Sequence, residues 1–244
     1  MRHLFFALLL APMGLPAAHA AGPVEGVVLP FHEVDVSAQA TGPITELNVK
    51  EGDPVKAGQP LAQIYARLQE LEVERAKAQL ERHEFDAKGA KKLFESKIIP
   101  ESRALEMRIE FELARLQFET ANEQLKLRTV TAPLDGIVVE RYKDLGETVS
   151  TTQRVFRIVD VTKVYVRCLV RPERAAKLAS GQKVTVRFPQ IDPAAGFSAE
   201  VVLVDPCADA SGLFRVKLLL DNPGGRIHSG FRALVDLGEH NGQG

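Results

Sequence analysis

The chain has 244 residues, of which 45% are hydrophobic and 26% are charged, so it can bury one or two hydrophobic cores. Its formal net charge is −1, and charges of both signs are interspersed along the chain. This distribution excludes a nucleic-acid-binding surface, which needs a clustered basic face.

The first 20 residues have the features of an export signal. Arg2 and His3 precede an apolar run from Leu4 to about Leu15, and Ala18-His19-Ala20 fits cleavage by signal peptidase. The alternative is an uncleaved membrane anchor, but a membrane span needs about 20 apolar residues and this run is shorter and contains prolines. We therefore predict a cleaved signal peptide over residues 1–20 and a mature protein in the periplasm.

An internal repeat follows the signal. Residues 36–64 align without a gap onto residues 130–158, at a constant offset of 94. Short β-favouring runs in each copy are separated by matching turn residues, among them Gly52 and Gly146. The identical pairs are Val36/Val130, Ala38/Ala132, Gly42/Gly136, Glu46/Glu140, Gly52/Gly146, Val55/Val149, Gln59/Gln153 and Ile64/Ile158.

The repeat predicts a β-sandwich made of two halves. One copy alone would expose an unpaired sheet edge, whereas two copies can pair into a closed, flattened sandwich similar to a lipoyl-type carrier domain. Carrier domains bear a lipoyl or biotinyl group on a lysine at the junction between the halves. Here the junction after Ile64 holds a long insertion, and Lys56 lies inside the first half. We therefore expect Lys56 to be a surface residue and the chain to carry no cofactor.

Residues 65–129 are predicted to form an antiparallel hairpin of two helices joined at 95–101. The segment is rich in helix-forming residues, and its apolar residues recur with the alternating three-four spacing of a coiled coil. Arms of about 27 residues would reach about 40 Å. The expected interhelical seam contains Val73, Ala76, Leu80, His83, Ala87, Ala90 and Phe94, and then Ala104, Met107, Phe111, Ala114, Phe118, Ala121 and Leu125.

Two further sets of apolar residues on the hairpin lie outside the seam. They would be exposed to solvent unless they pack against a partner or against the hairpin itself. The set at the tip is our candidate for docking against another protein, and the alternative is that some of its members fold back against the helix ends. The other set is a weaker stripe on the second helix, which would either meet a neighbouring hairpin or stay partly exposed. The tip set is Leu93, Phe94, Ile98 and Ile99, and the stripe is Leu105, Ile109, Leu113 and Leu116.

The last third of the chain, residues 160–238, is predicted to form a small antiparallel β-barrel, because short β runs alternate there with turn residues. Residues 21–35 are also strand-like and are expected to join this barrel. A short helix ended by Gly181 is predicted within 171–182, and residues 239–244 form a tail.

No catalytic or metal-binding constellation is present in the sequence. The chain lacks the common nucleophile, phosphate-loop and zinc motifs, and its histidines are scattered without ligand spacing. We predict no enzyme activity, no cofactor and no metal site. Cys168 and Cys207 are the two cysteines, and in an oxidising compartment they either form a disulfide or remain as free thiols.

These features together resemble the periplasmic adaptor, or membrane fusion protein, family of tripartite efflux pumps, mostly of the resistance-nodulation-division (RND) type. The resemblance covers nearly the whole mature chain and is carried by GPITELNVKEGDPVKAGQPLAQI, TVTAPLDGIVVERYKDLGETV, LASGQKVTVRF and HSGFRALVDL. It implies a mostly β, α+β fold: a lipoyl-like split sandwich (36–64 and 130–159) interrupted by the coiled-coil hairpin (65–129) and followed by the barrel (160–238).

The resemblance also implies a function and partners. A homo-oligomeric ring of adaptors would bridge an inner-membrane transporter to an outer-membrane channel, with the hairpin tips facing the channel. An adaptor for an ABC-type exporter or type I secretion system, and an envelope interaction protein without a transport role, are the alternatives. The chain departs from the family in two respects. Gly89 and Pro100 stand where the family's tip carries Arg and Ser, and we expect the chain to lack the membrane-proximal domain of many adaptors.

Overall fold

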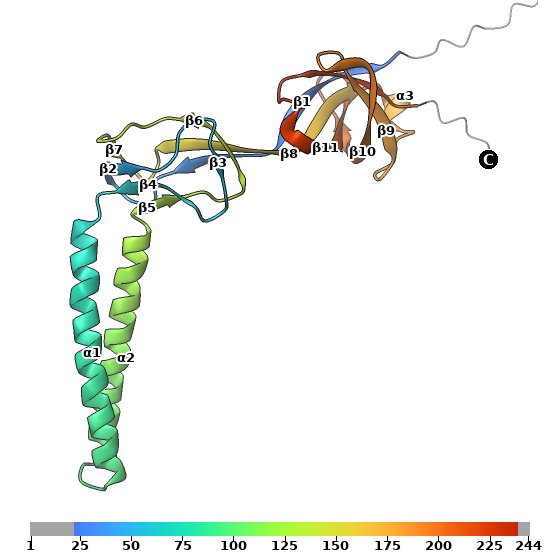
Figure 1. The fold of residues 1–244 in the computed structure, drawn as a ribbon. Coiled ribbons are helices and arrows are strands. Elements are labelled where there is room, and N and C mark those ends of the chain that lie inside the picture. Colours follow the sequence, from blue (N-terminus) through green and yellow to red (C-terminus); the bar gives the residue numbers. More distant parts are fainter. Residues whose placement is uncertain (1–21, 239–244) are drawn as a thin grey trace, which may run out of the picture.

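The computed structural model describes residues 22–238, so the predicted signal peptide and tail lie outside the described residues. The described chain has three parts (Figure 1). A ring of strands lies at one end, a β-sandwich lies next to it, and two long helices project from the sandwich to one side. The expected class, mostly β with an α+β organisation, is confirmed.

The projecting arm consists of helix α1 (Arg67–Glu95) and helix α2 (Glu101–Lys126), which pack antiparallel along their length. The expected seam positions face the partner helix, and alanines form its most buried points. At the tip, Lys97 adopts a positive φ of 58°, and the amide N–H of Ile98 donates to the carbonyl of Leu93 at 2.9 Å. Pro100 is extended and precedes the first turn of α2, where a missing N–H costs nothing. The buried alanines are Ala76, Ala90, Ala114 and Ala121.

The sandwich is built from short strands of both sequence copies. Its buried residues come about equally from the two copies and form one continuous core. Two long strands, β1 (Val24–Ser37) and β8 (Arg154–Val170), enter this core and also extend beyond it. The remaining strands are β2 (Gly42–Leu47), β3 (Pro54–Val55), β4 (Pro60–Ile64), β5 (Thr129–Thr131), β6 (Gly136–Arg141) and β7 (Thr148–Val149).

Hydrogen bonds repeat with the same 94-residue offset as the sequence. The amide of Gly52, in the turn of the first copy, donates to the carbonyl of Val138 in the second copy at 2.8 Å. The amide of Gly146 donates in return to the carbonyl of Ile44 at 2.9 Å. Both glycines have φ values that favour glycine, 92° and 84°. Each copy therefore completes the other, which produces a pseudo-two-fold sandwich.

The hairpin and the ring of strands leave the sandwich at equivalent points of this pseudo-symmetry. Strands β4 and β5 pair with Ala62 opposite Val130 and lead into the two helices. Strands β8 and β1 pair with Phe156 opposite Val36, each 94 residues from its counterpart, and lead into the ring. The two extensions are thus attached in the same way to the two halves.

Six strands form the ring, which closes because β1 pairs with both β12 and β8. Its order is β1-β12-β9-β10-β11-β8, and a second hydrophobic core fills it. The predicted helix in 171–182 is a single turn, α3 (Pro172–Ala175), and Gly181 with φ 85° lies in the turn before the next strand. The remaining elements are β9 (Lys183–Phe188), β10 (Asp192–Ala208), β11 (Phe214–Asp221), the 3-10 turn η1 (Pro223–Gly225) and β12 (Arg232–Asp236).

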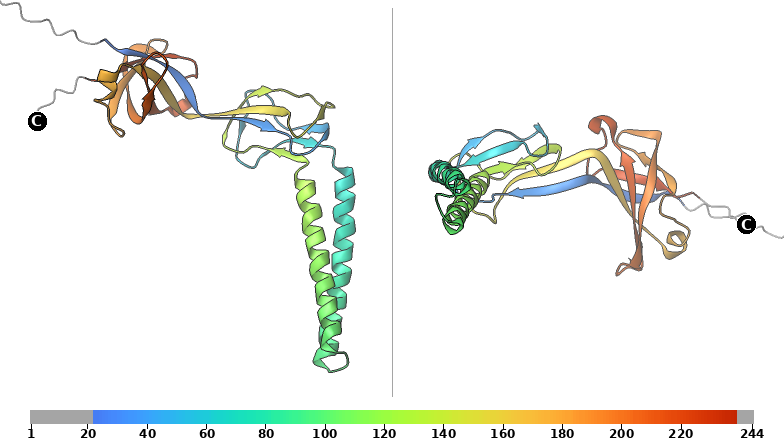
Figure 2. Two further views of the ribbon diagram at one scale, coloured as in Figure 1. Left: turned by 180° about the vertical axis from the view of Figure 1, so that it is seen from behind. Right: turned by 90° about the horizontal axis from the view of Figure 1, so that it is seen from below.

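A two-stranded ribbon of β1 and β8 connects the ring to the sandwich (Figure 2). Asn222 anchors this ribbon where the register of the two strands shifts. It is 2% exposed, its side-chain amide donates to the carbonyl of Val161 at 2.9 Å, and its backbone amide donates to Thr162 at the same distance. The side chain also exchanges hydrogen bonds with the backbone of Ile227. Asn222 therefore satisfies its polar atoms by holding β8 to the loop after β11.

Close packing at the ribbon explains why the repeat keeps a glycine at position 136. A Cβ there would lie 2.5 Å from the carbonyl oxygen of Val159 and 2.9 Å from the side chain of Ile158. We expect Gly136→Ala to lower the free energy of unfolding by about 1–3 kcal/mol, measured as a lower urea midpoint. Gly89→Ala, in open space on α1, is the matched control and should not lower it. Equal midpoints for Gly136→Ala and the native chain would contradict this account.

Candidate functional site: the distal half of the hairpin

The tip of the hairpin exposes the apolar residues that the sequence indicates. Leu93 and Phe94, at the end of α1, are 42% and 41% exposed, and Ile98 in the connector is 68% exposed. Ile99 is half-buried against the start of α2. The connector is closed by its own backbone hydrogen bonds, so these residues are held in a defined turn. The tip is therefore a compact apolar surface at the end of a long arm.

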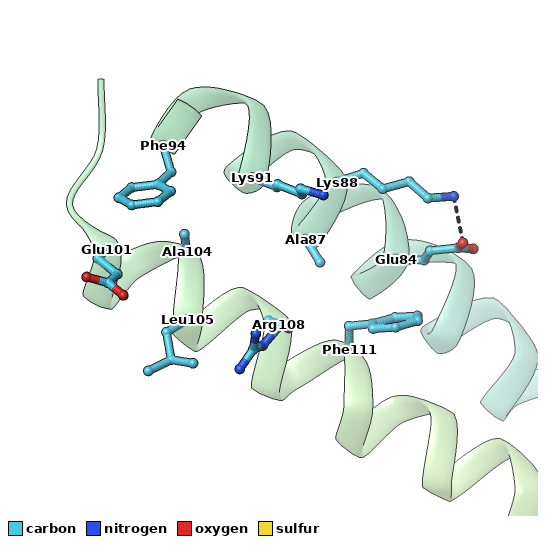
Figure 3. Close-up of a pocket in the computed structure, with 10 residues that line it drawn as sticks. All are labelled: Glu84, Ala87, Lys88, Lys91, Phe94, Glu101, Ala104, Leu105, Arg108 and Phe111. Atoms are coloured by element: carbon cyan, nitrogen blue, oxygen red, sulfur yellow. Dashed lines mark ion pairs between the residues drawn. The ribbon is translucent and has the colours of Figure 1, made fainter. Parts of the chain in front are cut away.

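A groove of about 520 Å³ lies between the helices just behind the tip. Ala87 and Ala104 line it between Phe94 and Phe111 (Figure 3). Its rim is charged: Lys88 pairs with Glu84 at 2.6 Å on α1, and Arg108 lies on α2. Sequence reasoning placed these alanines in the seam but did not foresee the groove. The small side chains of the facing seam residues Ala87 and Ala104 were the one feature of the sequence that could have predicted the groove.

A contact of His83 shows how the two helices are aligned. His83 is half-buried in the seam, as expected, and its Nδ1 lies 3.5 Å from a carboxylate oxygen of Glu110 on α2. This contact places residue 83 of α1 level with residue 110 of α2. Helix α1 runs toward the tip and α2 runs away from it. Each residue further along α1 therefore lies level with a residue one position earlier in α2, with a rise of about 1.5 Å per residue.

Both helices also carry exposed apolar residues along their length, and three residues of the predicted stripe, Leu105, Leu113 and Leu116, border grooves between the helices. Phe85 on α1 is 78% exposed, the highest value among the exposed large hydrophobic side chains of residues 22–238. The predicted stripe on α2 is exposed as well, with values from 44% to 56%. The hairpin thus has unpartnered apolar surface at its tip and along both helices.

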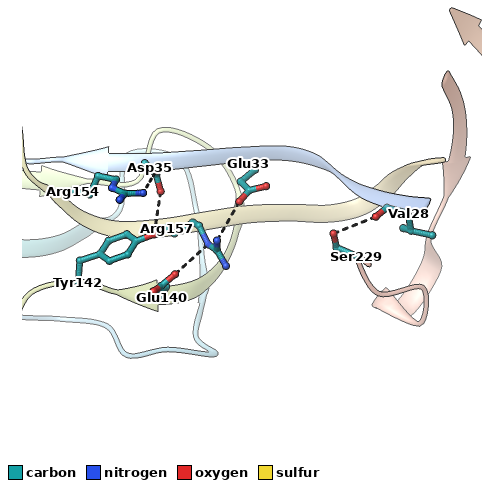
Figure 4. Close-up of polar contacts among 8 residues, drawn as sticks. All are labelled: Val28, Glu33, Asp35, Glu140, Tyr142, Arg154, Arg157 and Ser229. Atoms are coloured by element: carbon teal, nitrogen blue, oxygen red, sulfur yellow. Dashed lines mark hydrogen bonds and ion pairs between the residues drawn. The ribbon is translucent and has the colours of Figure 1, made fainter. Parts of the chain in front are cut away.

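Polar contacts fix the ribbon to the sandwich, at the side away from the hairpin (Figure 4). Arg157 of β8 lies between Glu33 of β1 at 3.5 Å and Glu140 of β6 at 3.6 Å. Arg154 donates to Asp35 at 3.1 Å. These groups are partly exposed, so their contribution to stability is modest. Their role is to join the ribbon to strand β6 of the sandwich, so that the ribbon leaves the sandwich in a defined direction.

Comparison with known families agrees with this architecture. Residues 32–161, more than half of the chain, match the family model described as RND MFP, barrel-sandwich hybrid domain. The chain belongs to this family. The matched range contains both half-motifs and the complete hairpin, and the RND membrane fusion proteins are efflux adaptors.

Individual membrane fusion proteins are similar over much of the chain. The nodulation protein NolF of Rhizobium meliloti is 24% identical, over 88% of this chain and 62% of its own length. The cobalt-zinc-cadmium resistance protein CzcB of Cupriavidus metallidurans is 26% identical, over 64% of this chain and 33% of its own. The chain therefore spans about half the length of the curated relatives it matches.

Among solved structures, a MacA-MexA chimera that contains the α-hairpin domain of Pseudomonas aeruginosa MexA superposes with a TM-score of 0.77. It is 25% identical and covers 87% of this chain and 78% of its own. ZneB from Cupriavidus metallidurans shares the fold with a TM-score of 0.54, 22% identity, and coverage of 88% of this chain and 97% of its own.

Membrane fusion proteins are non-catalytic adaptors. Between residues 22 and 238 no three His, Cys, Asp or Glu side chains gather in a way that could hold a metal ion. Over the same range, none of the helices combines the length and the apolar character that a membrane crossing requires.

The two cysteines do not form the disulfide that the sequence left open. Both are free: Cys168 of β8 is buried in the ring and Cys207 of β10 is exposed. Strand β11 pairs with both β8 and β10 and lies between them, with Val216 opposite Cys168. Strands two apart in a sheet are separated by about 10 Å, whereas a disulfide needs Cα atoms no more than about 7 Å apart. The strand order excludes the bond.

The two thiols should differ in reactivity. Burial raises the pKa of the Cys168 thiol to about 11, so it stays protonated and shielded as the pH is raised from 7 to 9. We expect a maleimide or disulfide reagent to label one thiol per native chain at pH 7 and pH 9, and two after unfolding in urea. In Cys207→Ser the native chain should take up no label. Two labelled thiols in the native chain would contradict the buried position of Cys168.

Proposed function

We propose that this chain is the non-catalytic periplasmic adaptor of a tripartite export system, bridging an inner-membrane transporter to an outer-membrane channel. The single observation that carries the proposal is the hairpin of the membrane fusion fold with its exposed apolar tip. A long arm ending in exposed apolar groups is explained if the tip is buried against another protein.

The channel-binding surface is the tip set, Leu93, Phe94, Ile98 and Ile99. These residues would pack against the ends of channel helices, because a helical tip presents side chains suited to helix-on-helix contact. Gly89 and Pro100 offer no polar side chain at the positions where related adaptors have Arg and Ser. Recognition by this chain therefore relies on apolar contact.

The ring of strands and the sandwich take the remaining roles. In the assembled system, sandwiches of several copies lie side by side around the export path, and the closed ring of strands faces the transporter in the inner membrane. Export of the chain to the periplasm by its N-terminal signal supplies the location. Metal-resistance proteins among its relatives make divalent cations one class of substrate to test, beside hydrophobic drugs.

A charge at the tip should stop export without unfolding the protein. We expect Leu93→Asp and Ile98→Asp each to weaken channel binding at least tenfold, since burying an unpaired carboxylate costs more than about 1.4 kcal/mol. Leu68→Asp is the matched control, because Leu68 is 67% exposed, like Ile98, but lies at the base of the same hairpin.

The measurement is growth of a strain lacking the native gene, complemented with each variant, on zinc, cobalt and cadmium salts and on hydrophobic drugs. Co-purification of the channel gives binding directly, and circular dichroism checks the fold. If the two tip variants support growth and channel capture as well as Leu68→Asp does, the tip is not the docking surface. If the native chain restores growth on none of these compounds and captures no channel, the adaptor function itself is contradicted.

A further inference from the structure

We propose that Lys97, at the apex of the hairpin, determines the specificity of the docking tip, and that its ammonium group pairs with a carboxylate side chain of the outer-membrane channel. The inference rests on the proposed adaptor function and deepens it, because it adds one charged contact to the apolar ones. Three features of Lys97 carry it: an unfavourable backbone conformation, its exposure among apolar residues, and the absence of a counter-charge on the described part of the chain.

The first feature is the backbone conformation of Lys97. Helix α1 ends in a Schellman motif, in which the amide N–H of Lys97 donates to the carbonyl of Phe94 at 2.8 Å. The amide N–H of Ile98 donates to the carbonyl of Leu93 at 2.9 Å. The motif needs a left-handed residue just after the helix, and Lys97 takes this place with φ 58°. Glycine is the usual residue there, because a Cβ makes positive φ unfavourable.

The chain has glycine at its other left-handed positions. Nine further residues between 22 and 238 have positive φ, and all nine are glycines, Gly52 and Gly146 among them. Lys97 is the exception within this range. Residues held in unfavourable backbone conformations concentrate at functional sites, where the side chain is worth its cost in stability. The side chain of Lys97, and not the turn, therefore accounts for its presence.

The second feature is the position of Lys97 among apolar residues. Lys97 is exposed in the connector between the helices, next to Ile98 and close in sequence to Leu93 and Phe94. A partner that buries these apolar side chains also removes water from the ammonium group between them. Burial of an unpaired charge is strongly unfavourable. A surface that receives this tip must therefore supply a negative charge, and a carboxylate is the side chain that does so.

The third feature is that the hairpin does not neutralise this charge. None of the ion pairs among residues 22–238 includes Lys97, and Glu95, two residues before it, lies 4.0 Å from Lys91 on α1. The carboxyl end of α1 attracts a positive charge, but the start of α2 repels one, and Lys97 lies between the two. The charge gains little within the hairpin and is available to a partner.

The test measures channel binding and hairpin stability on the same full-length variants. The probe is the channel that co-purifies with the native chain, purified in detergent. Lys97→Gln removes the charge and keeps the strained backbone, so we expect a Kd at least tenfold higher and an unchanged thermal midpoint. Lys97→Arg keeps the charge and should bind within about threefold of the native chain. Lys77→Glu is the matched control, an exposed lysine of α1 about 30 Å from Lys97, and should bind like the native chain.

Lys97→Gly separates the turn from the side chain. Glycine relaxes the left-handed residue, so we expect the thermal midpoint of the hairpin, followed by circular dichroism, to rise by about 2–4 °C. Channel binding should nevertheless weaken as much as in Lys97→Gln. A residue with a merely structural role would give a stabler hairpin with unchanged binding. Added salt should weaken binding of the native chain and have little effect on Lys97→Gly.

A charge exchange identifies the partner residue. Lys97→Glu should bind the channel more weakly than Lys97→Gln, because it places two carboxylates together. We expect one aspartate or glutamate at the periplasmic end of the channel, when changed to lysine, to restore binding of Lys97→Glu and to weaken binding of the native chain.

Three results would each overturn the inference: equal binding by the native chain and Lys97→Gln, native binding that does not depend on salt, or failure of every carboxylate exchange in the channel to restore Lys97→Glu. If Lys97→Gln binds normally while Leu93→Asp and Ile98→Asp do not, the tip docks by apolar contact alone and the adaptor function stands. If the native chain captures no channel, the adaptor function itself is contradicted and this inference falls with it.

Discussion

The exchange of hydrogen bonds between the two half-motifs is the constraint on which the rest of the molecule depends. Each glycine turn donates to a strand of the other copy, so neither half can complete its backbone pairing alone. The long separation of the halves in sequence makes this pairing a non-local one. The antiparallel hairpin returns the chain to the point where it left the sandwich, so the two halves lie together in the folded protein.

The sandwich in turn sets where the two extensions point. The helices and the ring of strands leave from pseudo-equivalent strand pairs, so the geometry of one junction is a copy of the other. At one junction the chain turns into α-helix, and at the other the strands simply continue. A scaffold that resembles a carrier domain has thus been kept, while the turn that would hold a cofactor lysine has become the base of an arm.

Much of this could be predicted from the sequence because two periodicities were strong. The 94-residue repeat located the strands of the sandwich, and the three-four spacing gave seam residues that the structure buries or half-buries, such as Ala90 and Ala114. Sequence patterns did not predict the ends of elements that are set by pairing with distant parts of the chain. Strand β8 runs without a break through the expected boundary at residue 159, and the helix expected over 171–182 is one turn. Phe85 gave no signal, because a single exposed residue has no period.

The ribbon that joins the ring to the sandwich has a mechanical consequence. Two paired strands form a thin strip, which bends easily across its thin direction and resists bending within its own plane. Asn222 clamps the strip at one end, and Arg157 with its two carboxylate partners holds it at the other. Strand β8 pairs with β6 of the sandwich up to Val159 and with β11 of the ring from Lys163, so only residues 160–162 of β8 separate the two bodies and any bending is confined to this short segment.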